Sequence, residues 1–336
     1  MTILKDVAKI AGVNISTVSR ALRDSHLVNR ELKEKIKKIA GKLNYVPDAR
    51  AKSLATNIKN TIALVVPYRQ FTGGEVYNEM IRGIYEKVEE ELRIAIILTS
   101  FERDNHSFFR IIDENRLDGA IIIGDTYSDE DIKMISGILF PVILLHQKVD
   151  SPASNIVNIY SDNREGIRLM TEHLIKKRNR KNLLYVGGGE RYKSNQERTA
   201  GFLKEVKREK IKYKVLNAAY ERGAGSGYDL IQDLFQKGDF NYDGIVCSSD
   251  DLAIGIIRFL LEKDRGFYQK ISITGYDNKA NSSYIYPALT TVDHQPYQIG
   301  RASAEILLNW IYNKKKPVKK SYVFIPTLVI RESCGK

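Results

Sequence analysis

The side chains with the clearest potential for chemistry lie in a short polar stretch near the amino terminus, from Ile15 to Leu22. Helical spacing places Val18, Ala21 and Leu22 on its inward side, so the other side chains face outward. Hydroxyls, an apolar group and an arginine on one exposed helix face are the groups that read base edges in the DNA major groove. Arg20 has two interpretations, since a guanidinium can fork onto a guanine or hold a phosphate.

Three blocks of helical spacing around this stretch predict a small three-helix core. The blocks are Val7, Ala8 and Ala11, then Val18, Ala21 and Leu22, then Leu32, Ile36, Ile39 and Leu43. Between the first two blocks, Gly12 permits a tight turn and Asn14 is a suitable N-cap. Two short helices joined so closely predict a helix-turn-helix, whose second helix enters the major groove. The candidate DNA-contacting residues of this segment are Ile15, Ser16, Thr17, Ser19, Arg20, Asn29 and Tyr45.

The distribution of charge supports a nucleic-acid partner for the same segment. The chain has a formal net charge of +12, and residues 1–60 hold nine Lys and four Arg against three Asp and two Glu, which gives +8. A small basic segment before a nearly neutral body is the electrostatic pattern of a DNA-binding module. A solvated helix face is the alternative interpretation, and it suits Lys33, Lys35, Lys37 and Lys38.

After Asn60 the pattern changes to alternating strand-like and helix-like blocks in two successive sets. The first set has strands at 62–66, 94–99, 119–124 and 141–145 and a helix at 77–92. The second set has helices at 164–177, 196–209, 228–236 and 252–261 and strands at 183–187, 214–216, 244–248 and 272–275. This rhythm predicts an α/β protein with two lobes of doubly wound parallel sheet. Ligands of such sheets bind where the carboxyl ends of the strands meet a cleft.

Composition and motifs exclude several other classes. With 43% hydrophobic and 28% charged residues the chain is typical of folded globular proteins, and its apolar runs are too short to cross a membrane. No secretory signal opens the sequence, so we expect a cytoplasmic protein. Cys247 and Cys334 fit neither a disulfide framework nor a zinc site. No metalloprotease, Walker or nucleophile-elbow motif is present, and residues 187–189 lack dinucleotide-binding spacing, so we expect no enzyme, no metal and no cofactor.

Four runs of sequence, at 4–8, 11–13, 16–22 and 43–47, carry a resemblance to the headpiece of the lac repressor and galactose repressor family. The resemblance continues into residues 49–55, which look like the hinge helix of that family. It implies further DNA contacts from Arg50, Ala51, Lys52 and Leu54, with the leucine wedged into a base step of the minor groove. A core position for Leu54 is the alternative.

The rest of the chain resembles the effector-binding core of the same family, which is similar to type I periplasmic sugar-binding proteins. The resemblance implies a helix-turn-helix headpiece at 1–46, a hinge helix and linker at 47–60, and an effector-binding and dimerisation core at 61–336. Lobe one is expected at about 61–158 and 291–318, and lobe two at about 159–290 and 319–336. A helix at 297–312 then returns to the first lobe, and a strand at 322–330 returns to the second.

The resemblance also implies where the effector binds. Arg198 matches the family arginine that forks onto sugar hydroxyls, and Asp277 matches the carboxylate that accepts hydrogen bonds from them. The alternatives are a helix-surface salt bridge for Arg198 and a turn or helix cap for Asp277.

Six further residues are weaker candidates for the same cleft. Ser249 and Asp250 stand where many relatives have Asn-Asp, and either contact with ligand or capping of the next helix suits them. His146 stands where lactose-responsive relatives have an aspartate. The aromatic candidates for stacking on a sugar ring are Tyr68, Phe71 and Tyr77. Ordinary packing is the alternative for the histidine and for all three aromatic residues.

Together these patterns predict a DNA-binding transcriptional regulator of the repressor type, whose operator affinity is controlled by a sugar between the two lobes. The expected partners are a palindromic double-stranded operator, a sugar or sugar-derived effector, and a second copy of the chain in a homodimer, with no membrane. The expected linkage is that the effector favours a core geometry in which residues 48–55 of two copies no longer pair. A catabolite-control-type regulator set by a protein corepressor is the alternative, and a sugar-binding protein without a regulatory role is a further one.

Overall fold

The structure is a computed structural model, and it describes residues 3–22, 24–45, 58–67, 74–91, 94–101, 107–189, 192–218 and 223–334. The predicted contact residues Arg50, Ala51, Lys52, Leu54, Tyr68 and Phe71 lie outside these ranges. The chain divides into two units, Met1–Asn60 and Thr61–Lys336, called here the head and the body. No helix among the described residues is long and apolar enough to span a bilayer.

The head is a bundle of three helices, α1 (Leu4–Ala11), α2 (Ile15–Leu22) and α3 (Arg30–Lys42). Its buried core consists of Val7, Ala8, Ala11, Val18, Ala21, Val28, Ile36 and Ala40. Gly12 ends α1 with φ +71°, a left-handed conformation that favours glycine, and its N–H donates to the carbonyl of Ala8 at 3.0 Å. The predicted three-helix core with a tight turn is therefore confirmed.

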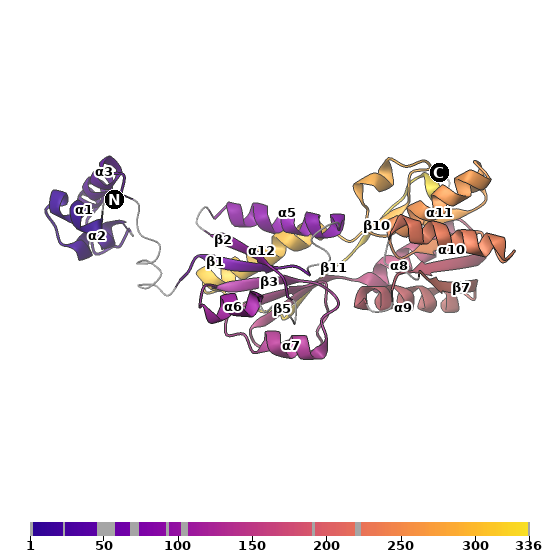
Figure 1. Ribbon diagram of the computed structural model, residues 1–336, viewed down its shortest axis with the longest axis horizontal. Helices are drawn as coiled ribbons and strands as arrows, with labels where there is room; N and C mark the ends of the chain where they lie inside the picture. Colours follow the sequence, from indigo (N-terminus) through magenta and orange to yellow (C-terminus); the bar gives the residue numbers. More distant parts are fainter. Residues whose placement is uncertain are drawn as a thin grey trace. The chain divides into compact units, whose positions relative to one another are not determined.

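The first lobe of the body is built on a six-stranded parallel sheet with the order β11-β5-β4-β3-β1-β2. The strands are β1 (Thr61–Val65), β2 (Ala95–Thr99), β3 (Gly119–Ile123), β4 (Val142–Leu145), β5 (Ile156–Ser161) and β11 (Ser321–Phe324). Helices α5 (Glu75–Glu89) and α12 (Pro296–Tyr312) cover one face, and α6 (Ser107–Asp113) and α7 (Asp129–Ser136) cover the other (Figure 1).

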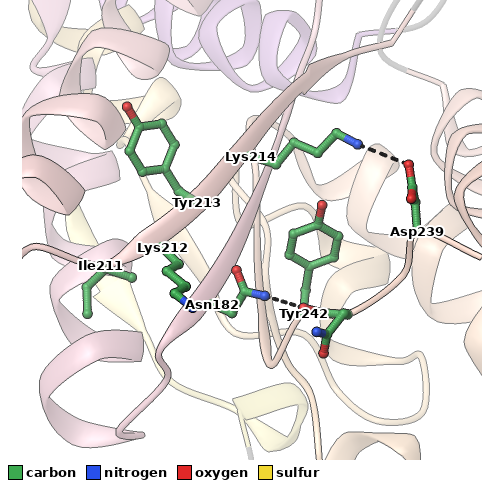
Figure 2. A pocket seen from close by; sticks show the side chains of 8 residues that line it. Asn182, Ile211, Lys212, Tyr213, Lys214, Asp239 and Tyr242 are labelled. Carbon is green, nitrogen blue, oxygen red and sulfur yellow. Dashed lines mark hydrogen bonds and ion pairs between the residues drawn. The ribbon is translucent and has the colours of Figure 1, made fainter.

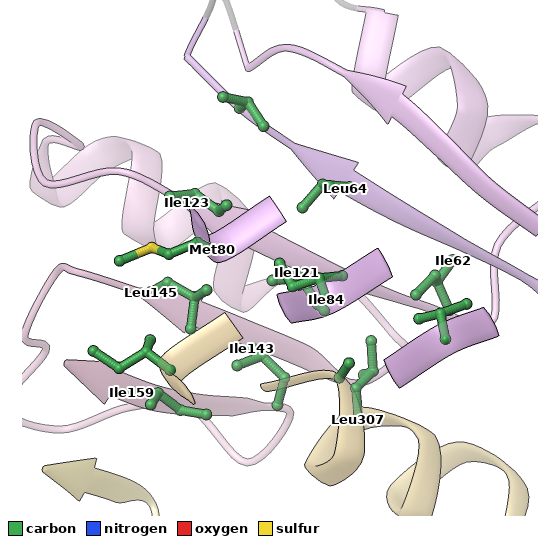
Figure 3. Packing of buried hydrophobic residues seen from close by; sticks show 14 of the residues in the cluster. Ile62, Leu64, Met80, Ile84, Ile121, Ile123, Ile143, Leu145, Ile159 and Leu307 are labelled. Carbon is green, nitrogen blue, oxygen red and sulfur yellow. The ribbon is translucent and has the colours of Figure 1, made fainter. Parts of the chain in front are cut away.

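Both faces of this sheet are buried, which explains its uninterrupted apolar runs. Ile62 and Leu64 pack with Met80 of α5 and Leu307 of α12 (Figure 3). Ala63, between them, points to the opposite face and packs in the cluster under α6 and α7. Alternate residues of one strand thus anchor helices on opposite sides.

The second lobe has a four-stranded parallel sheet with the order β7-β6-β8-β9. Its strands are β6 (Asn182–Gly187), β7 (Lys212–Asn217), β8 (Gly244–Cys247) and β9 (Ser272–Thr274). Helices α8 (Asn163–Glu172, continued by a π-turn at His173–Lys177) and α9 (Lys193–Arg208) pack on one face, and α10 (Ala224–Gln236) and α11 (Asp250–Lys263) on the other. Short 3₁₀ turns follow at Phe267–Gln269, Ala280–Ser283 and Glu332–Cys334.

The prediction of a single strand at 322–330 is wrong. The segment forms two strands, β11 in the first-lobe sheet and β12 (Thr327–Val329), which pairs antiparallel with β10 (Thr291–Asp293). Pro326 lies between them, and a proline has no N–H to continue a ladder. Since β5 and β11 both belong to the first sheet, residues 159–161 and 321–324 lie in lobe one, although the sequence placed them in lobe two.

In each lobe one pair of helices approaches closely at glycines. A Cβ added to Gly83 of α5 would lie 2.2 Å from the carbonyl oxygen of Tyr297, and one on Gly300 of α12 would lie 2.1 Å from that of Met80. In lobe two, a Cβ on Gly255 of α11 would meet the backbone of α10 even more closely, 1.8 Å from the carbonyl oxygen of Ala224. The backbones of these helix pairs therefore touch, and side chains larger than hydrogen do not fit between them.

We expect Gly300→Ala to destabilise the body by about 1–3 kcal/mol, because α5 and α12 must separate to admit the methyl group. Urea unfolding followed by circular dichroism measures the change. Gly225→Ala in α10 is the matched control, since no atom lies within 4 Å of its added Cβ, and we expect it to be neutral or slightly stabilising. Equal stabilities of the two variants would contradict the close-packing argument.

Candidate functional site

The outward face of α2 presents the groups that the sequence assigned to DNA. Ile15 is 46% exposed, Ser16 and Arg20 are exposed, and Thr17 and Ser19 are half-buried. No hydrogen bond or ion pair within the described part of the head holds the Arg20 guanidinium. This side chain is therefore available for a base or a phosphate.

Two other predicted DNA contacts have structural roles inside the head. Asn29 is the N-cap of α3, and its side-chain oxygen accepts the Leu32 N–H at 2.8 Å. Tyr45 is half-buried against the helical core, and its N–H donates to the carbonyl of Ala40 at 2.9 Å. Both contributions stabilise the bundle that carries α2.

Part of the positive charge of α3 also serves the fold of the head. The ammonium of Lys37 lies 2.9 Å from the carboxylate of Asp24, and this hydrogen bond lowers the pKa of Asp24. Lys33 donates to the Asp24 carbonyl at 3.0 Å, and Lys35 to the Ala11 carbonyl at 3.5 Å. These lysines tie α3 to the loops beside α2, so part of the basic charge of the head stabilises its fold.

In the body, the predicted effector residues gather at the carboxyl ends of parallel strands. His146 follows β4 in lobe one. Ser249 and Asp250 follow β8, and Asp277 follows β9, in lobe two. Arg198 comes from the second turn of α9. This is the edge of such sheets where small ligands bind.

Arg198 is buried, with 5% of its surface exposed, and its guanidinium is held from several sides. Nε donates to Oδ1 of Asn163 at 3.0 Å, and Nη1 donates to the carbonyl of Ser248 at 2.6 Å. The guanidinium also lies over the ring of Tyr276, 3.8 Å from its centroid. A helix-surface salt bridge, the alternative interpretation, does not describe this buried position.

Asp277 supplies the carboxylate that faces this arginine. Its side chain is 11% exposed, and Oδ1 lies 3.8 Å from Nη1 of Arg198 and 3.6 Å from Nε2 of His294. Its φ of +123° is a conformation that side chains rarely adopt, and its N–H donates to the carbonyl of Val292 at 3.0 Å. A strained residue held by its surroundings is a frequent feature of ligand sites.

Four aromatic rings form a row that crosses from one lobe to the other. Tyr77 of α5 and His146 have ring centroids 6.1 Å apart, and His146 and His294 are 5.6 Å apart. His294 stacks on Tyr276 at 5.8 Å, next to the Arg198 guanidinium. The row places two predicted residues, Tyr77 and His146, beside the Arg198–Asp277 pair.

Ser249 and Asp250 are engaged by the protein itself. The Ser249 hydroxyl accepts the Leu252 N–H at 3.4 Å and so caps α11. Asp250 is fully buried: one carboxylate oxygen accepts from the hydroxyl of Thr291 at 2.5 Å, and the other accepts from the N–H of Lys279 at 2.8 Å. The capping alternative is thus observed for Ser249.

Polar contacts also join the two lobes. Asp125, after β3, accepts a 2.5 Å hydrogen bond from the hydroxyl of Ser194 at the start of α9. Glu75, at the start of α5, accepts the N–H of Ala280 at 2.7 Å. Neither contact can persist unchanged if the lobes move relative to each other.

Asn163, Tyr276 and His294 complete the surroundings of Arg198 and Asp277, and sequence reasoning missed all three. Asn163 is 35 residues from its partner Arg198. His294 follows β10, a strand that the sequence did not predict. Tyr276 adjoins Asp277 in the chain, and an aromatic residue directly before the predicted carboxylate was the one available signal.

A separate groove of about 530 Å³ lies on the other side of lobe two (Figure 2). It is lined by Asn182, Ile211, Lys212, Tyr213, Lys214, Asp239, Asn241 and Tyr242. The Asn182 amide donates to the Asn241 carbonyl, and Lys214 lies 3.7 Å from Asp239. Because Asn182 and Lys212 begin β6 and β7, this groove is at the end of the sheet opposite to Arg198.

We expect Asp250→Asn to flatten the pH dependence of stability between pH 5 and 7. Burial, and secondly the charge of Asp277, raise the pKa of Asp250 to about 7. The folded protein then keeps a proton that the unfolded chain releases near its ordinary pKa of 3.8, so stability falls as pH rises through this window and levels off above it.

Urea unfolding at several pH values measures this effect. Asp229→Asn, at an exposed position of α10, is the control with the same change of charge. Identical slopes of stability against pH in the two variants would disprove the assignment to Asp250.

Comparison with known proteins identifies the family of the chain. Residues 3–48 match the model for bacterial regulatory proteins of the lacI family, and residues 171–334 match a periplasmic binding protein-like domain. The HTH-type transcriptional regulator RegA of Clostridium saccharobutylicum is 30% identical over 340 residues, covering 99% of each chain.

Two solved structures share the fold over nearly the whole length. The lac repressor dimer bound to operator and the anti-inducer ONPF has a TM-score of 0.83 at 23% identity, covering 99% of each chain. The complex of the transcriptional regulator CelR with cellobiose has a TM-score of 0.71 at 22% identity, covering 99% of this chain and 100% of that one. With its helix-turn-helix head, its two-lobed body and a relative that matches it from end to end, the chain belongs to the lacI family of bacterial regulatory proteins and is a DNA-binding transcriptional regulator.

Proposed function

We propose that the chain is a repressor of a palindromic operator and that a sugar held by Arg198 and Asp277 sets its operator affinity. The observation that carries this proposal is the buried pair itself. Nε and Nη1 of Arg198 are committed within the protein, whereas Nη2 has no acceptor among the described residues. Nη2 offers a donor, and the Asp277 carboxylate, 3.8 Å from Nη1 of the same guanidinium, offers an acceptor, a combination that suits vicinal hydroxyls.

The surroundings of the pair also fit a sugar. Carbohydrate rings have apolar faces that stack on aromatic side chains, and the row from Tyr77 to Tyr276 places aromatic side chains beside the pair. The CelR complex, similar in fold, holds cellobiose. We propose no further cofactor and no catalytic step, since binding energy alone drives regulation of this kind.

The effector would act by favouring one relative position of the lobes. Asp125 and Glu75 reach from lobe one to lobe two in the arrangement described, and His146 meets His294 between them. A ligand that contacts both lobes stabilises the relative position of the lobes to which it binds more tightly. The resulting change in operator affinity is limited by the difference between the ligand's affinities for the two positions of the lobes.

We also propose that the body forms a homodimer through an apolar surface on lobe two. A groove of about 560 Å³ lies between α10 and α11, lined by Tyr228, Ile254, Leu261, Ile285 and Tyr286 among others. Tyr286 is 61% exposed, and Leu98 on the edge strand β2 of lobe one is 48% exposed. Exposed apolar surface of this kind marks an interface, and a dimer matches the two half-sites of a palindromic operator.

The test of the effector is a thermal-shift and calorimetric screen of the full chain against neutral sugars and sugar phosphates, followed by operator binding with each hit. The operator is first enriched from random duplexes. A ligand at 100 times its dissociation constant adds about 2.7 kcal/mol of stability. A sugar that binds and changes operator affinity supports the proposal. A chain that binds its operator but responds to no sugar, and instead to a protein from its host, would overturn it in favour of a corepressor.

We expect Arg198→Lys to abolish the response to the effector while operator binding is retained. A lysine keeps the charge but lacks the planar fork that holds Asn163, the Ser248 carbonyl and the ligand together. Calorimetry with the sugar and fluorescence anisotropy with the operator measure the two properties. Arg168→Lys is the control, because among the described residues the ion pairs of that arginine are with Glu165 and Glu172 on α8. A normal response of Arg198→Lys would refute the assigned site.

We expect Arg20→Ala to lower specific operator affinity by about 1–3 kcal/mol and to relax the preference at one base position, if the guanidinium reads a guanine. Anisotropy titrations against single-base operator variants measure this. A uniform loss on all duplexes would instead assign Arg20 to a phosphate. Lys38→Ala, on the exposed surface of α3, is the control of equal charge.

A further inference from the structure

The loop between α12 and β11 carries a concentrated positive charge. Residues 314–320 contain five lysines, at 314, 315, 316, 319 and 320. All five are exposed, and no carboxylate in the described part of the chain lies within ion-pair distance of any of them. Since the body has a net charge of +4 in total, its other residues together carry −1. The excess positive charge of the body is therefore located in this loop.

The charge of the loop is held without compensation from the described residues. Partial desolvation, and secondly the charge of Lys316, lower the pKa of Lys320, as expected for like charges close together. The Lys320 ammonium donates to the carbonyl of Ala153 at 2.8 Å, which is a neutral acceptor. In the neighbouring loop before β3, the carboxylate of Glu114 binds Arg116 at 3.1 Å instead. Repulsion between the lysines is relieved when they bind an anionic surface.

The position of the loop in the fold indicates which anionic surface the lysines face. The loop leads into the amino-terminal end of β11, which runs parallel to β5, so it lies along the amino-terminal edge of the first-lobe sheet. β1 starts at the same edge with Thr61, directly after the linker from the head. Asp118 connects the start of β1 with the start of the lysine loop. Its carboxylate accepts hydrogen bonds from the Thr61 N–H at 3.3 Å and from the hydroxyl of Tyr312 at 3.2 Å, and Tyr312 stands two residues before the first lysine.

We propose that the lysines of residues 314–320 bind the phosphates of DNA beside the site that the head reads. The proposal rests on the proposed function, in which the head binds an operator. The chain between Tyr45 and Ile58 spans at most about 45 Å when fully extended, so the tether keeps the head, and any DNA that it holds, no farther than this from the start of β1. Lysine contacts to phosphate require no particular base sequence and add affinity that depends strongly on salt.

The competing assignment is that the lysine loop binds an acidic protein. The place of the loop in the fold argues against this assignment. A protein-binding loop has no reason to lie at the edge from which the DNA-binding head is tethered. A set of five ammonium groups with a single exposed apolar side chain, Val318, also lacks the aromatic and apolar anchors typical of protein interfaces.

The test compares two duplexes that contain the enriched operator, one without flanks and one with about 15 extra base pairs on each side. The loop variant replaces Lys314, Lys315, Lys316 and Lys319 by Gln in the full chain and leaves Lys320 in place. The control variant replaces Lys181, Lys207, Lys210 and Lys212 by Gln, which are exposed lysines of lobe two. Both variants lose four positive charges, and thermal unfolding verifies that both are folded.

On the flanked duplex we expect the loop variant to bind more weakly than the wild type and the control. The slope of log affinity against log salt should become shallower by about 0.9 for each phosphate that the variant no longer neutralises. On the short duplex all three proteins should bind alike, and effector binding should not change.

Three results would overturn the proposal. They are an unchanged salt slope of the loop variant on the flanked duplex, an equal loss of affinity in the control variant, and an equal loss of affinity on both duplexes. A wild-type chain that enriches no operator at all would instead remove the proposed function on which the inference rests.

Discussion

The burial of one guanidinium organises the carboxyl-end edge of lobe two. Arg198 is buried, and the burial of a guanidinium demands hydrogen-bond acceptors and negative charge nearby. Asn163, the Ser248 carbonyl and Asp277 meet the demand from the start of α8 and from the ends of β8 and β9. One side chain thereby fixes three loops, and the loops in turn fix the geometry that a ligand would find.

The same edge contains a second buried ionisable group, the carboxylate of Asp250, on which burial and hydrogen bonding have opposite effects. Its carboxylate fixes Lys279 and Thr291 through hydrogen bonds, yet burial and the nearby charge of Asp277 raise its pKa. A neutral Asp250 leaves Asp277 as the main negative charge facing Arg198. The charge state of Asp250 therefore changes the electrostatic surroundings of the Arg198–Asp277 pair.

Patterns within the sequence predicted the local elements of this protein well, and long-range partners poorly. Apolar runs located the strands because both faces of each sheet are buried, and the turn at Gly12 followed from its residue type. Pro326 was a local signal for a break in the last strand, but the sheet that each half joins depends on the fold, and local spacing does not contain that information. Asn163 and His294 reach Arg198 and Asp277 only through the fold, so no spacing rule pointed to them.

The proposed effector site and the proposed DNA-binding loop lie at opposite ends of the first-lobe strands. Their carboxyl ends carry Asp125 and His146 toward lobe two, whereas their amino ends carry Thr61, and thus the tether of the head, together with the lysine-rich loop. A sheet buried on both faces, with α5 and α12 in backbone contact at Gly83 and Gly300, resists internal deformation. A change in contacts at one end is then expressed as movement of the whole lobe, because a tightly packed unit rotates more readily than it bends. The proposed coupling between a sugar and DNA therefore needs no path of rearranged side chains through lobe one, only a shift of that lobe against its neighbour.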